Sequence, residues 1–372
     1  MPSEKIPHPS WIEIDLAQFK KNVNILKKHL GGTLLCLPVK ANAYGHGLEM
    51  IGKSAEEAGC DYLAVAHLKE GILLRQAKVK IPILVLGAFH EDQISDLIHF
   101  NLEFSVGSKF KADLVAKKCQ QANHSCTVHI EVDTGMQRTG IRVENAADLF
   151  QHMVSLECFV IKGVYSHLAT ANFPHESFAL EQIAAFGSLF EIPLLNQAGL
   201  IRHIANSQGV CYFPSSYFDM VRPSLIAFGY SLENSPNTLA NLYPCFSVKT
   251  KISYFKVVEK GKGISYGHSY TTSKQTRIVT IPIGYGDGYR RCLSNRSSVL
   301  IRGRRFSVVG NICMDQLMVD IGDSEAYVGD EVVLIGKQGE EEITVQEIAD
   351  LAQTNLHEVL CFFNDRLPRI YV

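Results

Sequence analysis

The chain has 372 residues, a net charge of −2 and 46% hydrophobic residues, so it is long enough for two or three domains with ample cores. The balanced charge argues against a nucleic-acid-binding or membrane-binding basic surface, and no apolar run reaches the ~18 residues of a membrane span. Residues 1–10 lack the features of a signal peptide, and the ten cysteines show no C-x-x-C spacing. We therefore expect a cytoplasmic protein without a metal site or a disulfide framework.

The first element is a strand predicted over 11–16, where apolar and polar residues alternate. Asp15, with Gln18 three residues later, is typical of a helix start, and a basic amphipathic helix should follow to about His29. A (β/α)8 barrel has eight strands, and a ninth strand before its first helix would not belong to it. We therefore expect residues 1–16 to join a domain formed later in the chain.

Between residues 17 and 233, apolar runs alternate with helix-length segments such as 46–58, 109–122 and 176–190. Eight such units predict an α/β fold, an N-terminal (β/α)8 barrel with a parallel sheet. The predicted barrel strands are 34–39, 62–66, 83–87, 103–107, 127–132, 161–168, 202–206 and 219–229.

Polar residues gather where the predicted strands end, which in such a barrel is the face that carries the reactive groups. Singly, each is more often a packing or capping residue. Five sets at equivalent strand ends are hard to explain by packing alone. They are Lys40, 131–138, Ser166 with His167, Asn206 with Ser207, and Arg222.

Lys40 directly follows the apolar run 34–39. Lost hydration there favours the neutral amine that a Schiff base needs. Most lysines after strands merely extend to solvent. Here Tyr44 and the glycines on either side of His46 let the chain turn tightly and bring polar groups near the amine, so we favour a functional lysine.

The composition changes after Glu233. Residues 234–240 are rich in Ser, Asn and Pro, which is typical of a linker. Over 241–372 the predicted strands are short and separated by glycine-containing turns, with one clear helix at 345–352. This part is predicted to form a C-terminal, mainly β domain.

Several segments together resemble the pyridoxal-phosphate-dependent alanine racemases of fold type III, and the resemblance covers nearly the whole chain. The most specific segments are 39–47, 133–140, 166–171, 206–207, 219–222, 263–270, 284–288 and 310–315.

The resemblance implies pyridoxal 5'-phosphate as the cofactor, held by Lys40 as a Schiff base. Arg222 would face the pyridine nitrogen. An arginine offers only donors, so this nitrogen stays unprotonated and racemisation is favoured over transamination. The residues implied to bind the cofactor are Lys40, Tyr44, Arg138, His167, Asn206, Ser207, Arg222, Ser224 and Leu225.

Racemisation needs an acid–base group on each face of the α-carbon. The resemblance implies Lys40 for one face and Tyr266 for the other, with Tyr266 entering from the second subunit of a homodimer. Arg138, Tyr285 and Met314 would contact the substrate, alanine. No nucleic acid or membrane partner is implied.

Three departures from the family pattern stand out. Glu131 replaces a lysine, carbamylated in some relatives, and we expect it to hold Arg138 by a charge-assisted hydrogen bond. Asp365 stands where a phosphate-binding tyrosine is common, and should point away from an anion. Ser224 and Phe228 replace a glycine and a tyrosine. None of these changes removes a catalytic role.

The predicted function is interconversion of L-alanine and D-alanine by two-base proton transfer on a pyridoxal-phosphate aldimine, supplying D-alanine for peptidoglycan. One alternative is a broad-specificity or serine racemase on the same scaffold. Another is a non-catalytic pyridoxal-phosphate carrier, against which Tyr266 and the second domain argue. A basic-amino-acid decarboxylase is a weaker alternative still.

Overall fold

The computed structural model describes residues 9–171, 175–230 and 235–372. These residues form two compact units. One unit comprises residues 17–43 and 48–244. The other comprises the residues up to Leu16, the short segment 44–47 and residues 245–372. Each unit is described by itself below.

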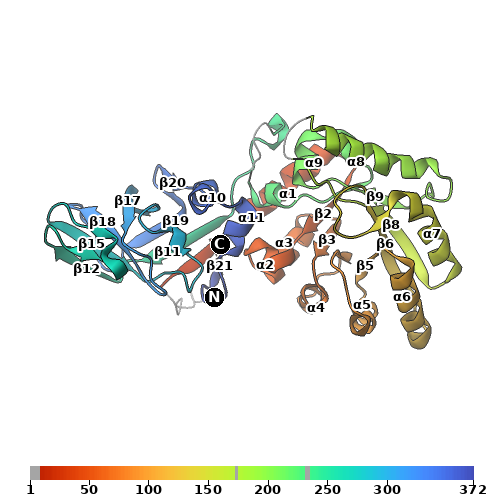
Figure 1. Ribbon diagram of the computed structural model, residues 1–372, viewed down its shortest axis with the longest axis horizontal. Coiled ribbons are helices and arrows are strands. Elements are labelled where there is room, and N and C mark those ends of the chain that lie inside the picture. Colours follow the sequence, from red (N-terminus) through yellow and green to blue (C-terminus); the bar gives the residue numbers. More distant parts are fainter. Residues whose placement is uncertain (1–8, 172–174, 231–234) are drawn as a thin grey trace. The chain divides into compact units, whose positions relative to one another are not determined.

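The first unit is a parallel barrel of eight strands in the order β10-β2-β3-β4-β5-β6-β8-β9 (Figure 1). Backbone hydrogen bonds close it between β9 and β10, from Asp219 N to Arg202 O (3.0 Å) and from Arg222 N to Ala205 O (2.8 Å). The predicted (β/α)8 barrel is confirmed. The strands are β2 Leu34–Pro38, β3 Tyr62–Val65, β4 Ile83–Val85, β5 Glu103–Val106, β6 Cys126–Asp133, β8 Phe159–Tyr165, β9 Ile201–His203 and β10 Met220–Val221.

Helices follow the strands along the chain, and α6 shows why they form where they do. Ser108 caps its first turn by accepting from Lys111 N (3.3 Å), and Asn123 ends it in the left-handed conformation. No helix in the described part is long and apolar enough to cross a bilayer. The main helices are α1 Leu16–Leu30, α3 Leu48–Glu57, α4 Leu68–Gln76, α5 Ile94–His99, α6 Lys109–Ala122, α7 Ala146–Ser155, α8 Ser177–Ser188 and α9 Ser207–Tyr212.

Two predicted elements have different limits in the structure. The strand expected over 219–229 ends at Val221, because Pro223 has no N–H for the ladder, and the chain then enters the 3-10 helix η5 Leu225–Phe228. The helix expected from residue 46 begins only at Leu48. Both boundaries lie next to predicted site residues.

The second unit is built on a ten-stranded sheet with the main order β12-β15-β18-β17-β16-β19-β11-β1-β21 and β20 paired to β19. β1 lies between β11 (antiparallel) and β21 (parallel). The strands are β1 Trp11–Ile14, β11 Phe246–Lys251, β12 Tyr254–Val258, β15 Thr276–Ile281, β16 Ser298–Ile301, β17 Arg304–Val309, β18 Leu317–Gly322, β19 Glu331–Gln338, β20 Glu341–Ile343 and β21 Arg369–Tyr371.

Three smaller features complete this unit. A two-stranded hairpin pairs β13 Gly263–Ile264 with β14 Tyr270–Thr271. Helix α10 Val345–Ala352 was predicted, but α11 Leu356–Cys361 was not; Asn355 caps α11 by accepting from Glu358 N.

Of the expected linker 234–240, residue 234 lies outside the described residues, and Asn237–Leu239 forms a 3-10 turn in the first unit.

The ion pair between Arg202 and Asp219 reinforces the closure of the barrel. Arg202 donates through Nε (2.6 Å) and Nη2 (2.9 Å) to the two carboxylate oxygens, and its backbone N–H donates as well (2.8 Å). Burial raises the pKa of Asp219, but these hydrogen bonds outweigh it and leave the pKa below its usual value. The pair therefore stabilises the fold where Asp219 is ionised.

We predict that Asp219→Asn lowers the free energy of unfolding by about 1–2 kcal/mol at pH 7, the range for part-buried charge-assisted hydrogen bonds. Because the folded pKa is depressed, this loss should shrink as the pH falls below about 4. Urea unfolding of both proteins from pH 3 to 7 measures it. Asp323→Asn, in the exposed pair with Lys274, is the control and should change little. A loss for Asp219→Asn that does not vary with pH would contradict this account.

Candidate active site

Lys40 begins a short left-handed turn at the carboxyl end of β2. The four residues that follow it, 41–44, all have φ between 52° and 55°. This conformation costs an L-residue about 1–2 kcal/mol, so the surroundings must hold it in place. Ala41 N donates to Glu70 Oε1 (2.7 Å), and Leu48 N donates to Asn42 Oδ1 (2.8 Å). These hydrogen bonds therefore stabilise the turn and fix the backbone position of Lys40.

The glycines after the turn are required by close approach in the second unit. A Cβ at Gly45, where φ is 81°, would lie 2.2 Å from Leu360 O, and one at Gly47 would lie 1.9 Å from the Tyr371 hydroxyl. Tyr44 is buried, with its ring 5.7 Å from that of His357. The tight turn expected around His46 is therefore present, and the positive φ of both glycines, together with the backbone contact at Gly45, disfavours larger residues there.

Arg222 is the central cation of the barrel, with only 3% of its surface exposed. Its Nη1 donates to His203 Nδ1 (2.6 Å) and His203 O (3.1 Å). Its Nη2 donates to Ser166 O (2.7 Å) and lies 3.3 Å from His167 Nδ1. The guanidinium also lies over the Tyr165 ring, 5.1 Å from its centre. A donor-only group is thus held rigidly just beyond the last barrel strand.

A chain of hydrogen bonds continues from Arg222 through the barrel interior. Burial, and then the Arg222 charge, hold the pKa of His203 well below its usual value, so this ring is neutral. It accepts from Arg222 at Nδ1, and its Nε2 therefore donates to His129 Nδ1 (2.9 Å). His129 Nε2 then donates to Glu103 Oε2 (2.9 Å). Every proton in this chain points away from Arg222 and toward the carboxylate.

His167 lies among three cations. Burial is the first cause that lowers the pKa of His167 to about 3, and the charges of Arg222, Arg138 and Lys40 lower it further. The ring is therefore neutral at physiological pH. All three charges therefore act on this one ring, although only Arg222 is buried, while Lys40 is half-buried and Arg138 is exposed.

A second group of predicted residues lies together after β9 and β10. Asn206 caps α9 by accepting from Gly209 N (2.9 Å). Ser224 N donates to the Ser207 hydroxyl (2.8 Å), and Leu225 begins the 3-10 turn η5. The structure thus brings Asn206, Ser207, Ser224 and Leu225 to neighbouring strand ends of one barrel.

The hydrogen bond expected between Glu131 and Arg138 is not among those formed by the described residues. Thr139 donates to Glu131 Oε1 instead (2.7 Å), and the Tyr165 hydroxyl lies near enough to the same carboxylate to lower its pKa. Arg138 acts on Glu131 only as a nearby charge. Burial is the largest effect and raises the pKa of Glu131. Glu131 is therefore held by hydroxyl groups that the sequence pattern did not indicate.

The remaining predicted residues, Tyr266, Tyr285 and Met314, lie on three loops of the second unit. Asn311 Nδ2 donates to Tyr266 O (2.6 Å), while Tyr285 N donates to Cys313 O (3.0 Å). All three side chains are exposed: Tyr266 by 72%, Met314 by 53% and Tyr285 by 41%. Such exposure of neighbouring large apolar groups is typical of a surface that binds something.

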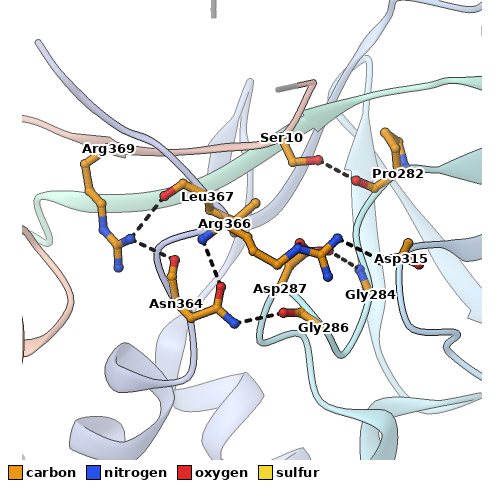
Figure 2. Close-up of polar contacts among 10 residues, drawn as sticks. All are labelled: Ser10, Pro282, Gly284, Gly286, Asp287, Asp315, Asn364, Arg366, Leu367 and Arg369. Atoms are coloured by element: carbon orange, nitrogen blue, oxygen red, sulfur yellow. Dashed lines mark hydrogen bonds and ion pairs between the residues drawn. The ribbon is translucent and has the colours of Figure 1, made fainter. Parts of the chain in front are cut away.

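Arg366 joins two of these loops, as Figure 2 shows. Its Nη2 donates to Asp315 Oδ1 (2.7 Å), and its Nε lies 3.2 Å from Asp287 Oδ1. Asp287 is buried and accepts from Gly284 N (2.9 Å), and Asn364 Nδ2 donates to Gly286 O (2.8 Å). Arg366 thereby fixes the loop that carries Tyr285 against the loop that carries Met314.

Comparison with known proteins assigns the family. Residues 14–232 match the model of the alanine racemase N-terminal domain, and residues 245–371 match that of the C-terminal domain. The chain belongs to the alanine racemase family. An alanine racemase from Symbiobacterium thermophilum is 39% identical over 98% of this chain and 97% of the relative.

Solved structures agree with this assignment. The alanine racemase of Clostridium difficile 630 has a TM-score of 0.93 at 36% identity, covering 99% of this chain and 97% of that one. The alanine racemase of Bartonella henselae, described with covalently bound pyridoxal phosphate, has a TM-score of 0.87 at 28% identity, covering 98% and 100%. The activity of the chain is alanine racemisation, an isomerase reaction.

Several residues of this alanine racemase site escaped the sequence analysis. Glu103, His129 and His203 lie inside apolar runs, and only their alternation with buried apolar neighbours, as in Val128-His129-Ile130, could have indicated inward-facing positions. Arg366 shows no local pattern. Asp365 has 98% of its side chain exposed and pairs with Arg369 (3.5 Å). That it points away from a bound anion stays a prediction.

We predict that Glu131→Gln raises the free energy of unfolding at pH 7. The folded pKa of Glu131 lies above the unfolded value of about 4.3, so the ionised carboxylate destabilises the fold at neutral pH. The gain should vanish as the pH falls below about 4, where both states are protonated. Urea unfolding at pH 3.5 to 7 tests this, with Glu144→Gln at the exposed Glu144 as a neutral control. A loss of stability at pH 7 would show that the charge stabilises the fold.

Proposed function

We propose that pyridoxal 5'-phosphate bound at Lys40 is the cofactor of this racemase, and that Lys40 and Tyr266 exchange the α-proton of alanine. The convergence of Lys40, Arg138 and Arg222 around a neutral His167 carries this proposal. Three cations that act on one ring at the strand ends, one of them buried, suit a ligand that brings a phosphate and a phenolic oxygen, so the residues present fit the cofactor. When bound, pyridoxal phosphate withdraws electrons from the α-carbon and makes its proton acidic.

Each cofactor-binding residue has a proposed part that follows from its surroundings. Arg222 can only donate, because its guanidinium keeps its proton in proteins, and the chain of hydrogen bonds through His203 and His129 to Glu103 holds it in place. It would therefore keep the pyridine nitrogen as an acceptor. The Ser207 hydroxyl, which accepts from Ser224 N, and the Leu225 amide would bind the phosphate. The family resemblance adds Tyr44, Asn206 and Ser224 as further cofactor-binding residues. His167 would lie along the ring.

The two bases are proposed to act from opposite faces of the α-carbon. The amine of Lys40 would hold the proton on one face and the hydroxyl of Tyr266 on the other. Arg138, Tyr285 and the backbone amide of Met314 would orient the carboxylate and close the site to water. The position of Tyr285 and Met314 on loops joined by Arg366 supports a defined rather than a mobile arrangement.

The wider setting is proposed from the family. We place the enzyme in the cytoplasm, where it would supply D-alanine for peptidoglycan. A racemase of broader choice, such as one acting on serine, shares every cofactor residue. Incubating the purified protein with each L-amino acid and measuring the D-enantiomer formed discriminates between them: alanine should lead, and equal rates with serine would favour the broader enzyme.

We predict that Lys40 carries the cofactor covalently. Borohydride reduction of the yellow protein followed by peptide mapping should find the pyridoxyl group on Lys40, because its place after β2 puts its amine among the cations near His167. Lys40→Ala should remain colourless in the same treatment, while Lys80→Ala, at an exposed lysine, should label normally. A pyridoxyl group on another lysine would overturn the assignment.

We also predict that each active site takes Lys40 from one subunit of a homodimer and Tyr266 from the other. The exposure of Tyr266, Tyr285 and Met314 supports a surface that a partner covers. A two-fold dimer exchanges identical parts, so a mixed dimer of Lys40→Ala and Tyr266→Phe has one site with both defects and one with neither. Each variant alone should be nearly inactive.

Equal remixing of the two variants makes half of the dimers mixed, each with one good site of two, so about a quarter of the normal activity should return. Subunit exchange is verified separately with tagged chains. If exchange occurs and the mixture stays inactive, Lys40 and Tyr266 act within one chain.

A further inference from the structure

Three cysteines meet in the first unit outside the candidate active site. Cys119 lies in the last turn of α6, Cys126 is the first residue of β6, and Cys158 directly precedes β8. The sulfur atoms of Cys119 and Cys126 are 3.6 Å apart, and the Cys158 thiol lies close enough to Cys119 to lower the pKa of that thiol. Cys119 is therefore the central member of a cluster of three thiols.

The fold itself brings these residues together. Asn123 ends α6 in the left-handed conformation, so the chain turns back into β6 within a few residues. β6 pairs with β8 from its first residue, and Cys126 N donates to Cys158 O (3.0 Å). The cluster thus lies at the amino-terminal end of the barrel strands, while Asp133 ends β6 at its other end.

The surroundings of Cys119 differ from those of the other buried cysteines. The hydrogen bond between the Cys119 and Cys126 thiols, which is the largest effect, and the nearby Cys158 thiol lower the pKa of Cys119 to about 7, although burial opposes them. The same hydrogen bond and burial raise the pKa of Cys126. Burial instead raises the pKa of Cys211 to about 11 and that of Cys60 to about 12. The thiolate is the reactive form of cysteine, so the cluster holds one activated sulfur between two thiols.

We propose that Cys119, Cys126 and Cys158 form an oxidisable thiol site, which a hydroperoxide converts to a disulfide that always includes Cys119. Cys158 is the partly exposed member, while Cys119 and Cys126 are buried. The oxidant therefore meets Cys158 first.

The chemistry balances in two steps. The Cys158 sulfur, once it has lost its proton, attacks hydrogen peroxide: an S–O bond forms, the O–O bond breaks, and the leaving oxygen departs as water with that proton. Burial raises the pKa of Cys158 to about 11, so this first step limits the rate. The Cys119 thiolate then attacks the sulfenic sulfur, forming the S–S bond and releasing the second oxygen as water after it takes up a proton. Two thiols lose two electrons in total, and the peroxide becomes two waters.

The disulfide can then move within the cluster. Attack of the Cys126 thiolate on the Cys119 sulfur expels Cys158 and leaves a Cys119–Cys126 bond, with no further oxidation. The two sulfur atoms need to approach from 3.6 Å to the ~2.05 Å of a disulfide, a small movement at a helix end. Both possible products contain Cys119, which makes the proposal specific.

Peptide mapping separates the products. Trypsin places Cys119 and Cys126 together in residues 119–138, and Cys158 in residues 143–162. The native protein is treated with hydrogen peroxide, free thiols are blocked with iodoacetamide, and the digest is analysed by mass spectrometry. We expect either an unalkylated 119–138 peptide that has lost two hydrogens, or 119–138 linked to 143–162.

Single variants test the order of events. Cys119→Ser should abolish both products, Cys126→Ser should leave only the 119–158 link, and Cys158→Ser should slow oxidation about tenfold because the remaining thiols are buried. Cys292→Ser, at an exposed cysteine outside the cluster, should behave as the parent. Circular dichroism checks that each variant is folded. If Cys119→Ser does not fold, Cys119→Ala is used in its place, and the digest of the parent protein still tests the proposal without any variant.

Two results would overturn the proposal. One is that, in the parent protein, peroxide oxidises Cys292 while Cys119 and Cys126 are both still alkylated by iodoacetamide after unfolding. The other is a Cys126–Cys158 disulfide that forms as fast in the Cys119 variant as in the parent.

Discussion

A permanent positive charge buried inside the barrel is the constraint on which the site depends. Arg222 cannot lose its proton and is almost wholly removed from water, so each of its N–H groups needs an acceptor. Backbone oxygens of Ser166 and His203 and the ring of His203 supply acceptors for Nη1 and Nη2. Because an unpaired buried charge is costly, these acceptors also determine where the loop after β8 can lie.

The same constraint explains why the barrel interior is polar. The inside of such a barrel is usually filled by branched apolar side chains. Here His203, His129 and Glu103 cross it as one directed chain of hydrogen bonds. The chain of hydrogen bonds requires a neutral His203, because a protonated ring would direct an N–H group at Arg222 instead of accepting from it. Burial of the histidine is thus part of how the arginine is held.

The backbone strain after Lys40 has a comparable origin. Four consecutive residues in the left-handed region are unfavourable by themselves, and they persist because Glu70 and the Asn42 side chain bond the N–H groups around the turn. The carboxylate of Glu70 also accepts from Ala66 N and so joins this turn to the loop after β3. A rigid start for the Lys40 side chain follows from bonds made by its neighbours rather than by the lysine.

How far the sequence predicts this structure depends on whether the determining contacts are local. The strand at 103–107 and the helix at 109–122 were predicted almost residue for residue, because apolar runs and caps are local properties. The strand at 219–229 was overextended because the apolar run continues past Pro223 into a 3-10 turn. The resemblance supplied Tyr266 and Arg222, whereas no local pattern pointed to Arg366, whose partners lie about 50 and 80 residues away.

The thiol cluster is a second feature that local sequence patterns do not predict. Cys119 and Cys126 are seven residues apart, a spacing without meaning in a helix or strand alone, and Cys158 is 32 residues further on. They meet only because α6 ends at Asn123 and β6 pairs with β8 from its first residue. One strand, β6, therefore presents a cysteine at its start, a histidine of the Arg222 chain in its middle and Glu131 near its end. His129 and Glu131 share one face of the strand at successive inward positions, whereas Cys126 lies on the other face and meets Cys119 of α6, so the three reach different partners.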